Sequence, residues 1–180
     1  MKFSSANWLG LPLALWLLAG FTPRQEAGLP KAAQAESLFS LINDYRLSLA
    51  LPAIPYSASL TKVAAAHVKE LSQRGFSGES LHSWADCQFS PENPACMWEK
   101  PRQLTGYPGA GYEIAQYNGY GASPGDALKG WIESESHHAM MINQGMWAKH
   151  PWQAIGVAME GKFACVWFGE VPDRQENPDP

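Results

Sequence analysis

Hydrophobic residues fall at helical spacing in two segments of the first half of the chain. The first segment begins at Glu36, and the apolar positions on its inner face are Leu38, Leu41, Ile42, Tyr45 and Leu49. It ends near Ala50, because the prolines at 52 and 55 cannot continue a helix. The second segment has one largely apolar face, formed by Leu60, Val63, Ala64, His67 and Leu71. Ser57 or Ser59 caps its start, and Gly75 ends it.

A third helix and a hairpin are predicted in the second half. Ser123 can cap the helix, Pro124 suits its first turn, and the apolar stripe that follows is Ala127, Leu128, Trp131 and Ile132. Two apolar runs, 155–159 and 163–168, flank Gly161, which supplies the positive φ of a tight turn. Because both runs are apolar at nearly every position, we expect the hairpin to be buried between helices on its two faces. A further strand is expected at Tyr112–Tyr117.

Polar and titratable residues interrupt the apolar pattern between the third helix and the hairpin. The interruption consists of Glu133, Ser134, Glu135, Ser136, His137 and His138, after which the apolar run 139–142 resumes. We expect a polar turn here that presents a functional site. His138 should face solvent, because neighbouring side chains on a helix diverge in direction. His67 lies on an apolar stripe, so we expect a hydrogen-bonded core histidine there.

The rest of the chain lacks a clear period. Residues 1–22 are interpreted as a signal peptide, since the apolar run from Trp8 to Phe21 is roughly 14 residues long, short of the ~20 that a membrane-spanning helix needs. Residues 23–35 are expected to form a linker, 36–171 a single folded domain, and 172–180 a disordered tail. The segment 76–121 is expected to be mostly loop, apart from its one strand.

The net charge argues against nucleic acid as a partner, and the three cysteines have distinct expected roles. The formal net charge of -4 gives no basic surface, so nucleic acid is not an expected partner. Export would permit disulfides, and Cys87 and Cys96, which flank a short loop rich in turn formers, are the natural pair. Cys165 alternates with Phe163 and Trp167 in the last strand, so we interpret it as a buried small hydrophobe rather than a nucleophile.

Several short motifs occur in a characteristic order. They are NDYR (43–46) followed by LP, LHS (81–83), EIA (113–115), GWIESESHHAMMIN (130–143), and AIGVA and VWFGE in the closing hairpin. Together they resemble the CAP superfamily, the secreted domain shared by cysteine-rich secretory proteins, venom antigen 5 and plant pathogenesis-related proteins, and especially its bacterial members. The resemblance covers about 36–170 and implies an α+β fold, a three-layer α–β–α sandwich with a mostly antiparallel central sheet.

The resemblance also implies a cleft lined by two histidines and two acidic residues, which in some members holds a divalent metal. By position the histidines are His82 and His137, with Ser134 at the serine of the bacterial SPGH pattern. The Gly-Glu-Asn-Ile-Ala pattern of the family falls on 111–115, where Glu113, one residue late, is the best candidate acid. The second acid is Glu133, Glu135 or neither. The resemblance therefore makes His82, His137 and Glu113 candidate ligands of a metal such as zinc.

The family is functionally diverse, so the resemblance implies a fold more firmly than a function. Our preferred hypothesis is a secreted or periplasmic monomer that binds an extracellular or envelope lipid, carbohydrate or protein without catalysis. Candidate contact residues are the aromatic side chains Trp84, Trp98, Tyr107, Tyr112, Tyr117, Tyr120 and Trp147, whereas Trp131 and Trp167 are expected in the core. The alternatives are a metal-dependent hydrolase that uses the same cleft, and a structural envelope protein with a vestigial cleft. A serine nucleophile at 134 or 136 is disfavoured, because no GxSxG motif occurs.

Overall fold

A computed structural model describes residues 30–75 and 80–174. The helices are α1 (Lys31–Ser48), α2 (Ala58–Arg74), α3 (Ala95–Trp98), α4 (Lys100–Thr105), α5 (Pro124–Glu133) and α6 (Glu135–Met141), with a 3-10 turn, η2, at Gly145–Trp147. The strands are β1 (Tyr112–Tyr117), β2 (Ala154–Glu160) and β3 (Phe163–Gly169). The interpretation of residues 1–22 as a signal peptide lies outside the described residues. Within residues 30–75 and 80–174, no helix combines the length and apolar character needed to cross a bilayer.

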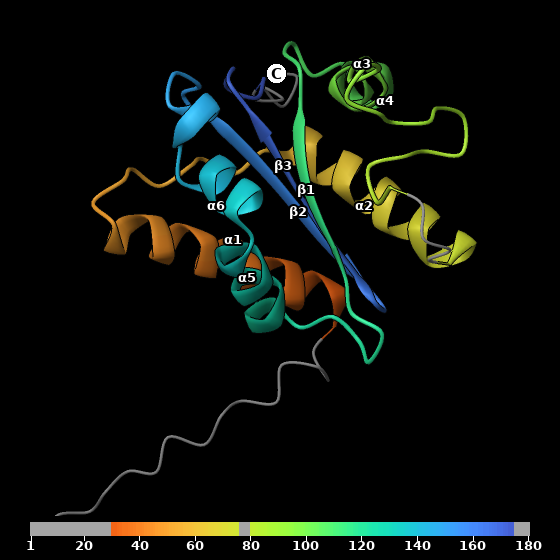
Figure 1. Cartoon of the computed structure of the whole chain (residues 1–180), viewed down its shortest axis with the longest axis horizontal. Coiled ribbons are helices and arrows are strands. Elements are labelled where there is room, and N and C mark those ends of the chain that lie inside the picture. Colours follow the sequence, from red (N-terminus) through yellow and green to blue (C-terminus); the bar gives the residue numbers. More distant parts are fainter. Residues whose placement is uncertain (1–29, 76–79, 175–180) are drawn as a thin grey trace, which may run out of the picture.

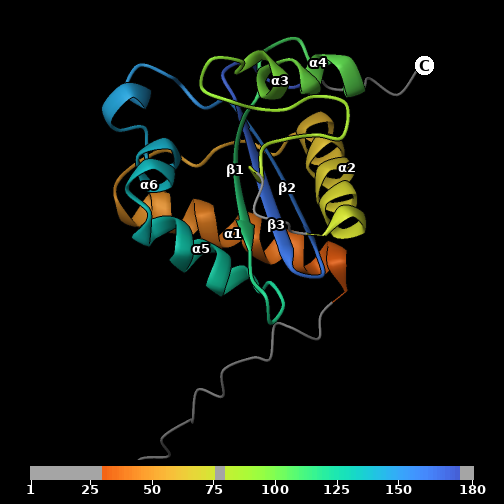
Figure 2. The same cartoon turned by 45° about the vertical axis from the view of Figure 1, so that its right-hand side comes forward.

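The fold has three layers, as predicted. The strands form one antiparallel sheet in the order β1-β3-β2, so β3 is central and β1 is an edge strand. Helix α2 covers one face, and α1, α5 and α6 cover the other (Figures 1 and 2). The short helices α3 and α4 lie beyond one end of β1 (Figure 1). The α+β sandwich expected from the sequence is therefore confirmed.

The alternation of side chains along β3 explains the two helical layers. Ala164, Val166 and Phe168 pack into the cluster that contains α1, α5 and α6. Phe163, Cys165 and Trp167 pack into the cluster that contains α2. Every residue of β3 is buried, because successive side chains point to opposite faces and both faces are covered. The hairpin turn has Gly161 at φ 60°, which confirms the predicted turn.

Three boundaries differ from the expectation or refine it. Helix α1 starts at Lys31, so the predicted linker is wrong for 31–35. Pro30 precedes the helix, its carbonyl accepts from the N–H of Gln34, and the alanines that follow favour helix despite their lack of an apolar stripe. Ser57 rather than Ser59 caps α2, and Gly75 ends it at φ 75°. The predicted polar turn after α5 is instead the helix α6, separated from α5 by Ser134 in an extended conformation.

The segment 76–121 is less irregular than expected. It contains α3 and α4, of four and six residues, which are too short to show a helical period in the sequence. The expected disulfide links Cys87 to Cys96, with the two Cα atoms 5.6 Å apart, and so ties the loop to α3. Strand β1 has the bounds predicted for it.

The expected disordered tail is wrong for its first residues, because Asp173 binds the start of α2. Its Oδ2 accepts from the Ser57 hydroxyl at 2.7 Å and from the N–H of Ser59 at 2.8 Å. Ser57 in turn accepts from the N–H of Leu60 at 3.0 Å. A carboxylate at this position satisfies a free helix donor and complements the positive end of the helix dipole. Residues 175–180 lie outside the described part of the chain.

We expect Asp173→Ala to lower the free energy of unfolding by about 1 kcal/mol, because α2 loses part of its N-terminal cap. Asp173→Asn, which keeps an acceptor oxygen but loses the charge, should fall between wild type and Asp173→Ala. Urea denaturation monitored by tryptophan fluorescence measures all three. Equal stability of Asp173→Ala and wild type would mean that the contact contributes nothing to folding.

Candidate functional site

The centre of the site is the carboxylate of Glu113, which projects from β1 toward the α2 layer. Its Oε1 lies 2.6 Å from His67 Nδ1, and its Oε2 lies 2.9 Å from His82 Nδ1. The Glu113 and His67 side chains are fully buried, whereas 20% of the His82 side chain is exposed. Because an ionised carboxylate only accepts hydrogen bonds, both Nδ1 atoms must carry the proton. One carboxylate therefore fixes the orientation of two imidazoles from different segments.

His67 supplies the buried end of this network. Its Nε2 lies 3.3 Å from the carbonyl oxygen of Ser83, and its ring stacks on Trp84 with centroids 4.1 Å apart. Both ring nitrogens face acceptors, an arrangement that suits the imidazolium form. Burial pushes the pKa of His67 down, but the charge and hydrogen bond of Glu113 outweigh burial and leave that pKa raised. The core histidine predicted at this position is confirmed, although its contact with the candidate acid was not anticipated.

Glu113 is ionised at neutral pH. Burial alone would raise its pKa, but the charge and hydrogen bond of His67 and the hydrogen bond of His82 lower that pKa to about 2. Cys165 lies beside the same carboxylate, is fully buried and forms no disulfide. Burial, followed by the charge of Glu113, raises the pKa of the thiol well above its usual value. Cys165 is therefore a protonated core residue, as predicted, and not a thiolate nucleophile.

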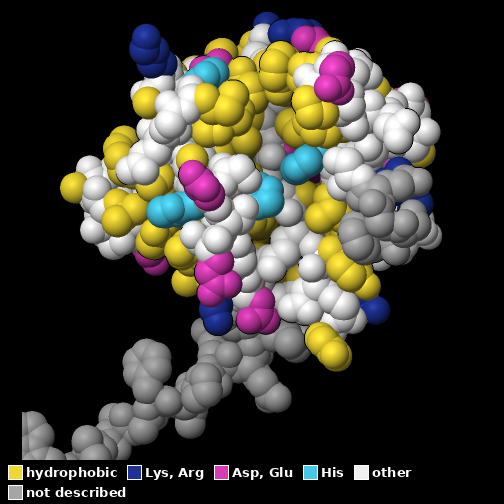
Figure 3. Space-filling view, in the orientation of Figure 1, with side chains coloured by type: hydrophobic (Ala, Val, Ile, Leu, Met, Phe, Trp, Pro, Cys, Tyr) yellow, Lys and Arg dark blue, Asp and Glu magenta, His cyan; other side chains and the backbone are white. Residues whose placement is uncertain are grey.

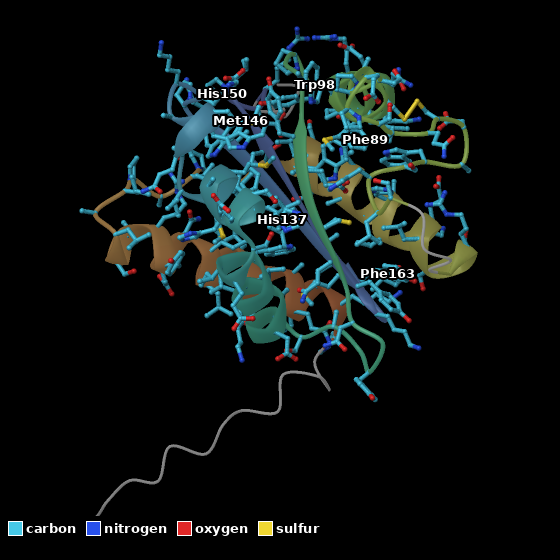
Figure 4. All side chains as sticks on the ribbon, viewed as in Figure 1. Phe89, Trp98, His137, Met146, His150 and Phe163 are labelled. Carbon is cyan, nitrogen blue, oxygen red and sulfur yellow. A yellow bond between two sulfur atoms is a disulfide. The ribbon has the colours of Figure 1, made fainter. Side chains whose placement is uncertain are left out.

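A cavity of about 370 Å³ opens beside β1. Its walls are Leu81 from the loop before β1, residues 115–117 of β1 itself, and Gly130, Trp131, Ser134 and His137 from α5 and α6. Histidine side chains lie at the rim of this hollow on the face shown in Figure 3, and His137 lies beside β1 (Figure 4). Burial, followed by the charge of His82, lowers the pKa of His137. His82, from the loop that follows α2, and His137, from α6, are thus close enough for the charge of one to affect the other, although of the two only His137 lines the cavity.

The other acidic candidates lie elsewhere. Glu133 is exposed and pairs with Lys129 at 3.8 Å, and Glu135 is exposed in the first turn of α6. Neither of them lines the cavity that contains Ser134 and His137. His138 is half-buried rather than solvent-facing and bonds to the Tyr45 hydroxyl at 2.8 Å, away from the cavity. The turn predicted here is helical because α6 continues through the polar residues to Met141, which is buried.

The aromatic side chains divide into core and surface groups. Trp131 and Trp167 are buried, as predicted, but Trp84 and Tyr107 are buried as well, so these two do not form a contact surface. Trp98 and Tyr120 are exposed, and Tyr112, Tyr117 and Trp147 are half-buried. Tyr112 packs against Trp98, Trp147, His150 and Trp152. Figure 4 shows Trp98, Met146 and His150 together at this end of β1.

Comparisons with known proteins agree with this architecture. An SCP-domain extracellular protein of Bacillus anthracis is 20% identical, with a TM-score of 0.57 over 77% of this chain and 41% of its own. An outer surface protein of Borrelia burgdorferi is 18% identical, with a TM-score of 0.58 over 78% and 95%. A cysteine-rich secretory protein of Staphylococcus aureus is 13% identical, with a TM-score of 0.56 over 83% and 40%.

At these identities the likeness concerns the fold, and the chain spans about two fifths of the length of the Bacillus and Staphylococcus proteins. A comparison with curated proteins gives no match. The sequence model of the family described as "Cysteine-rich secretory protein family", or CAP, matches residues 39–148, more than half of the chain. The chain therefore belongs to the CAP family.

Proposed function

We propose that this chain is an extracellular or envelope binding module whose cleft holds a divalent metal ion between His82 and His137. The observation that carries the proposal is the orientation of His82. Its Nδ1–H donates to Glu113, so Nε2 is the remaining ligand atom, and Nε2 has no hydrogen-bond partner within residues 30–75 and 80–174. A histidine held by a carboxylate through one nitrogen is the usual arrangement of a metal ligand.

The donor set suits a metal such as zinc. Metal ligation requires a neutral imidazole, and burial lowers the pKa of His137 and so favours its neutral form. Glu113 has both oxygens committed to imidazoles and is 1% exposed, so we assign it the orientation of His82 rather than direct ligation. With only two protein ligands, such an ion would keep open positions and would supply Lewis acidity toward an oxygen of the bound ligand.

Zinc titration by calorimetry tests the proposal. Wild-type protein is expected to bind one zinc ion at micromolar or tighter affinity, and His82→Ala and His137→Ala should each abolish the binding. The matched control is His138→Ala, which removes the histidine adjacent to His137 but outside the cavity, and which should bind zinc like wild type. Absent binding, or binding that survives both changes at the cleft, would rule the metal site out.

Hydrolysis by the same cleft is the alternative. The pairing of Glu113 with His82 resembles a base held by a carboxylate, and Ser134 shares the cavity with His137. Binding is favoured because, among the described residues, no carboxylate lines the cavity and could serve as a second acid or base. Zinc-loaded protein should therefore leave fluorescein-labelled casein uncleaved. Cleavage that His82→Ala and His137→Ala both abolish would establish the hydrolase instead.

A further inference from the structure

A group of aromatic rings lies at the surface where β1 begins. Tyr112 is at its centre, and the centroid of its ring lies 5.3–5.9 Å from those of Trp98, Trp147 and His150. Trp98 is 38% exposed, and Met146, which precedes Trp147, is 78% exposed. Figure 4 shows Trp98, Met146 and His150 together at this end of the sheet, and Figure 3 shows hydrophobic side chains gathered on both sides of the hollow. We call these five residues the aromatic platform.

Trp98 is held in place by contacts of its own short helix. Cys96 in α3 forms the disulfide with Cys87, and Met97 is buried in the core. The carbonyl of Trp98 itself accepts from the N–H of Gly111 at 3.0 Å, just before β1. A helix of four residues would not be stable alone, so these contacts fix its position. A ring fixed before the ligand arrives loses little conformational entropy on binding.

Trp147 and His150 are fixed from the other side of the platform. Their rings pack on each other with centroids 5.1 Å apart. The carbonyl of His150 accepts from the side-chain amide of Asn143, whose oxygen accepts from Arg46 at 2.7 Å. Two segments far apart in the sequence, one from α3 and one that follows η2, therefore present one preorganised surface on either side of Tyr112.

Polar groups border these rings. The Glu170 carboxylate is half-buried, with Oε1 2.6 Å from His150 Nδ1 and Oε2 3.4 Å from the Tyr112 hydroxyl. The indole N–H groups of Trp98 and Trp147 have no hydrogen-bond partner within residues 30–75 and 80–174. The surface therefore combines aromatic rings with two available donors and one carboxylate acceptor.

We propose that the aromatic platform binds a neutral glycan, a chain of pyranose sugars whose C–H faces lie on the rings of Trp98, Tyr112 and Trp147. This inference rests on the proposed binding function and names the class of ligand, but it does not require the metal ion. A pyranose ring has apolar faces and a rim of hydroxyl groups, so it complements aromatic rings that carry polar groups at their edges. Its hydroxyls would accept from the two indole N–H groups and donate to the Glu170 carboxylate.

A protein partner fits this surface less well, because a stable protein interface takes about 20–30 residues on each side. A membrane surface fits less well because anionic lipid is recognised by clusters of about four to eight lysines and arginines. Near the platform, Arg102 pairs with Glu99, which leaves Lys149 as the one exposed cation beside it in the described sequence. The carboxylates of Glu99 and Glu170 also disfavour an anionic polysaccharide, so a neutral glycan is the expected ligand.

Calorimetry with chitohexaose and with cellohexaose tests the proposal on the wild-type protein. We expect at least one of these neutral hexasaccharides to bind and to change the tryptophan fluorescence. Trp98→Ala and Trp147→Ala should each lower the affinity by about tenfold, the effect of losing one stacked ring, whereas Trp98→Phe should retain most of it. The matched control is Tyr56→Ala, which removes an exposed aromatic ring beside β2 and should bind like wild type.

Zinc binding measured on the same samples separates this inference from the metal site. Trp98→Ala should keep the zinc affinity of wild type, which would show that its loss of glycan binding does not come from unfolding. Glycan binding without zinc binding would support the platform and remove the metal site, and the reverse would overturn the platform alone. Equal glycan affinity of wild type, Trp98→Ala and Trp147→Ala would also overturn it. So would binding to phosphatidylglycerol vesicles that Trp98→Ala abolishes, since the rings would then belong to a membrane contact.

Discussion

Replacement of Glu113 by glutamine is expected to lower the free energy of unfolding by about 3 kcal/mol at mildly acidic pH. The substitution keeps the size of the side chain but removes the charge that stabilises a fully buried imidazolium at His67. Loss of one partner from a buried ion pair costs about 3–5 kcal/mol, and deprotonation of His67 keeps the cost at the lower end. The same change should weaken zinc binding by roughly 10–100-fold, because His82 loses the carboxylate that orients it.

The effect of Glu113→Gln should depend on pH in both directions. The pKa of Glu113 lies at about 2 in the folded protein, below its ordinary value of 4.5, so its contribution is present above pH 4.5 and is lost as the pH falls toward 2. The pKa of His67 is raised above 6.5, so its contribution is complete below pH 6.5 and is lost as the pH rises through the folded value. The difference between wild type and variant should therefore be largest between pH 4.5 and 6.5.

Urea denaturation of both proteins across this range measures the difference. Glu133→Gln is the matched control, since Glu133 is 66% exposed and pairs weakly with Lys129 across 3.8 Å. Its effect should stay within about 0.5 kcal/mol at every pH. A difference between wild type and Glu113→Gln that does not vary with pH would show that the pair is not ionised in the folded protein.

Gly156→Ala is expected to lower the free energy of unfolding by about 3 kcal/mol or more, because the added methyl group forces α2 away from the sheet. A Cβ at position 156 would lie 2.1 Å from the carbonyl carbon of Leu60 and 2.2 Å from the backbone nitrogen of Thr61, both in α2. These distances are shorter than any van der Waals contact. Backbone atoms of a helix cannot yield as a flexible side chain can, so the whole helix must shift. Because α2 carries His67, the shift would also disturb the contact with Glu113.

Thermal denaturation should show Gly156→Ala melting about 10 °C below wild type. Gly119→Ala is the control, since the nearest atom to its added Cβ is the Tyr117 hydroxyl oxygen at 3.8 Å, an ordinary contact. Its melting temperature should be unchanged or slightly higher. If both alanine variants melt like wild type, the close approach of α2 to β2 does not limit stability.

Much of this fold could be predicted from short-range patterns. The β2–β3 hairpin follows from two apolar runs around Gly161, and β1 follows from a strand-like segment whose bounds match. The sequence predicts a linker up to residue 35, but α1 begins at Lys31. Residues 31–35 have high helix propensity yet no apolar residues at helical spacing, so hydrophobic periodicity does not reveal them. The polar residues after α5 predict a turn, but the segment forms α6, whose buried residues, Met140 and Met141, both lie at its end and are too few to show a helical period.

The site was only partly predictable, because its contacts join segments far apart in the chain. Glu113 could be selected as the candidate acid, but which face of β1 it occupies depends on register, which sequence spacing alone does not determine. His67 was correctly placed in the core, yet nothing in its sequence neighbourhood indicates a carboxylate 46 residues away. The position of β1 at the edge of the sheet likewise follows from the strand order, in which β3, the last strand of the described residues, lies at the centre.

That strand order has a consequence for how the chain is made. β1 and β2 each pair with β3 and not with each other, so neither has a partner until residue 169 has emerged from the ribosome or a translocation channel. Asp173, which completes the cap of α2, emerges later still. Until then the apolar faces of α1 and α2 have no sheet to cover. We expect truncation before β3 to leave a chaperone-dependent, aggregation-prone chain rather than a partly folded domain, and folding of the complete chain to be governed by long-range contacts.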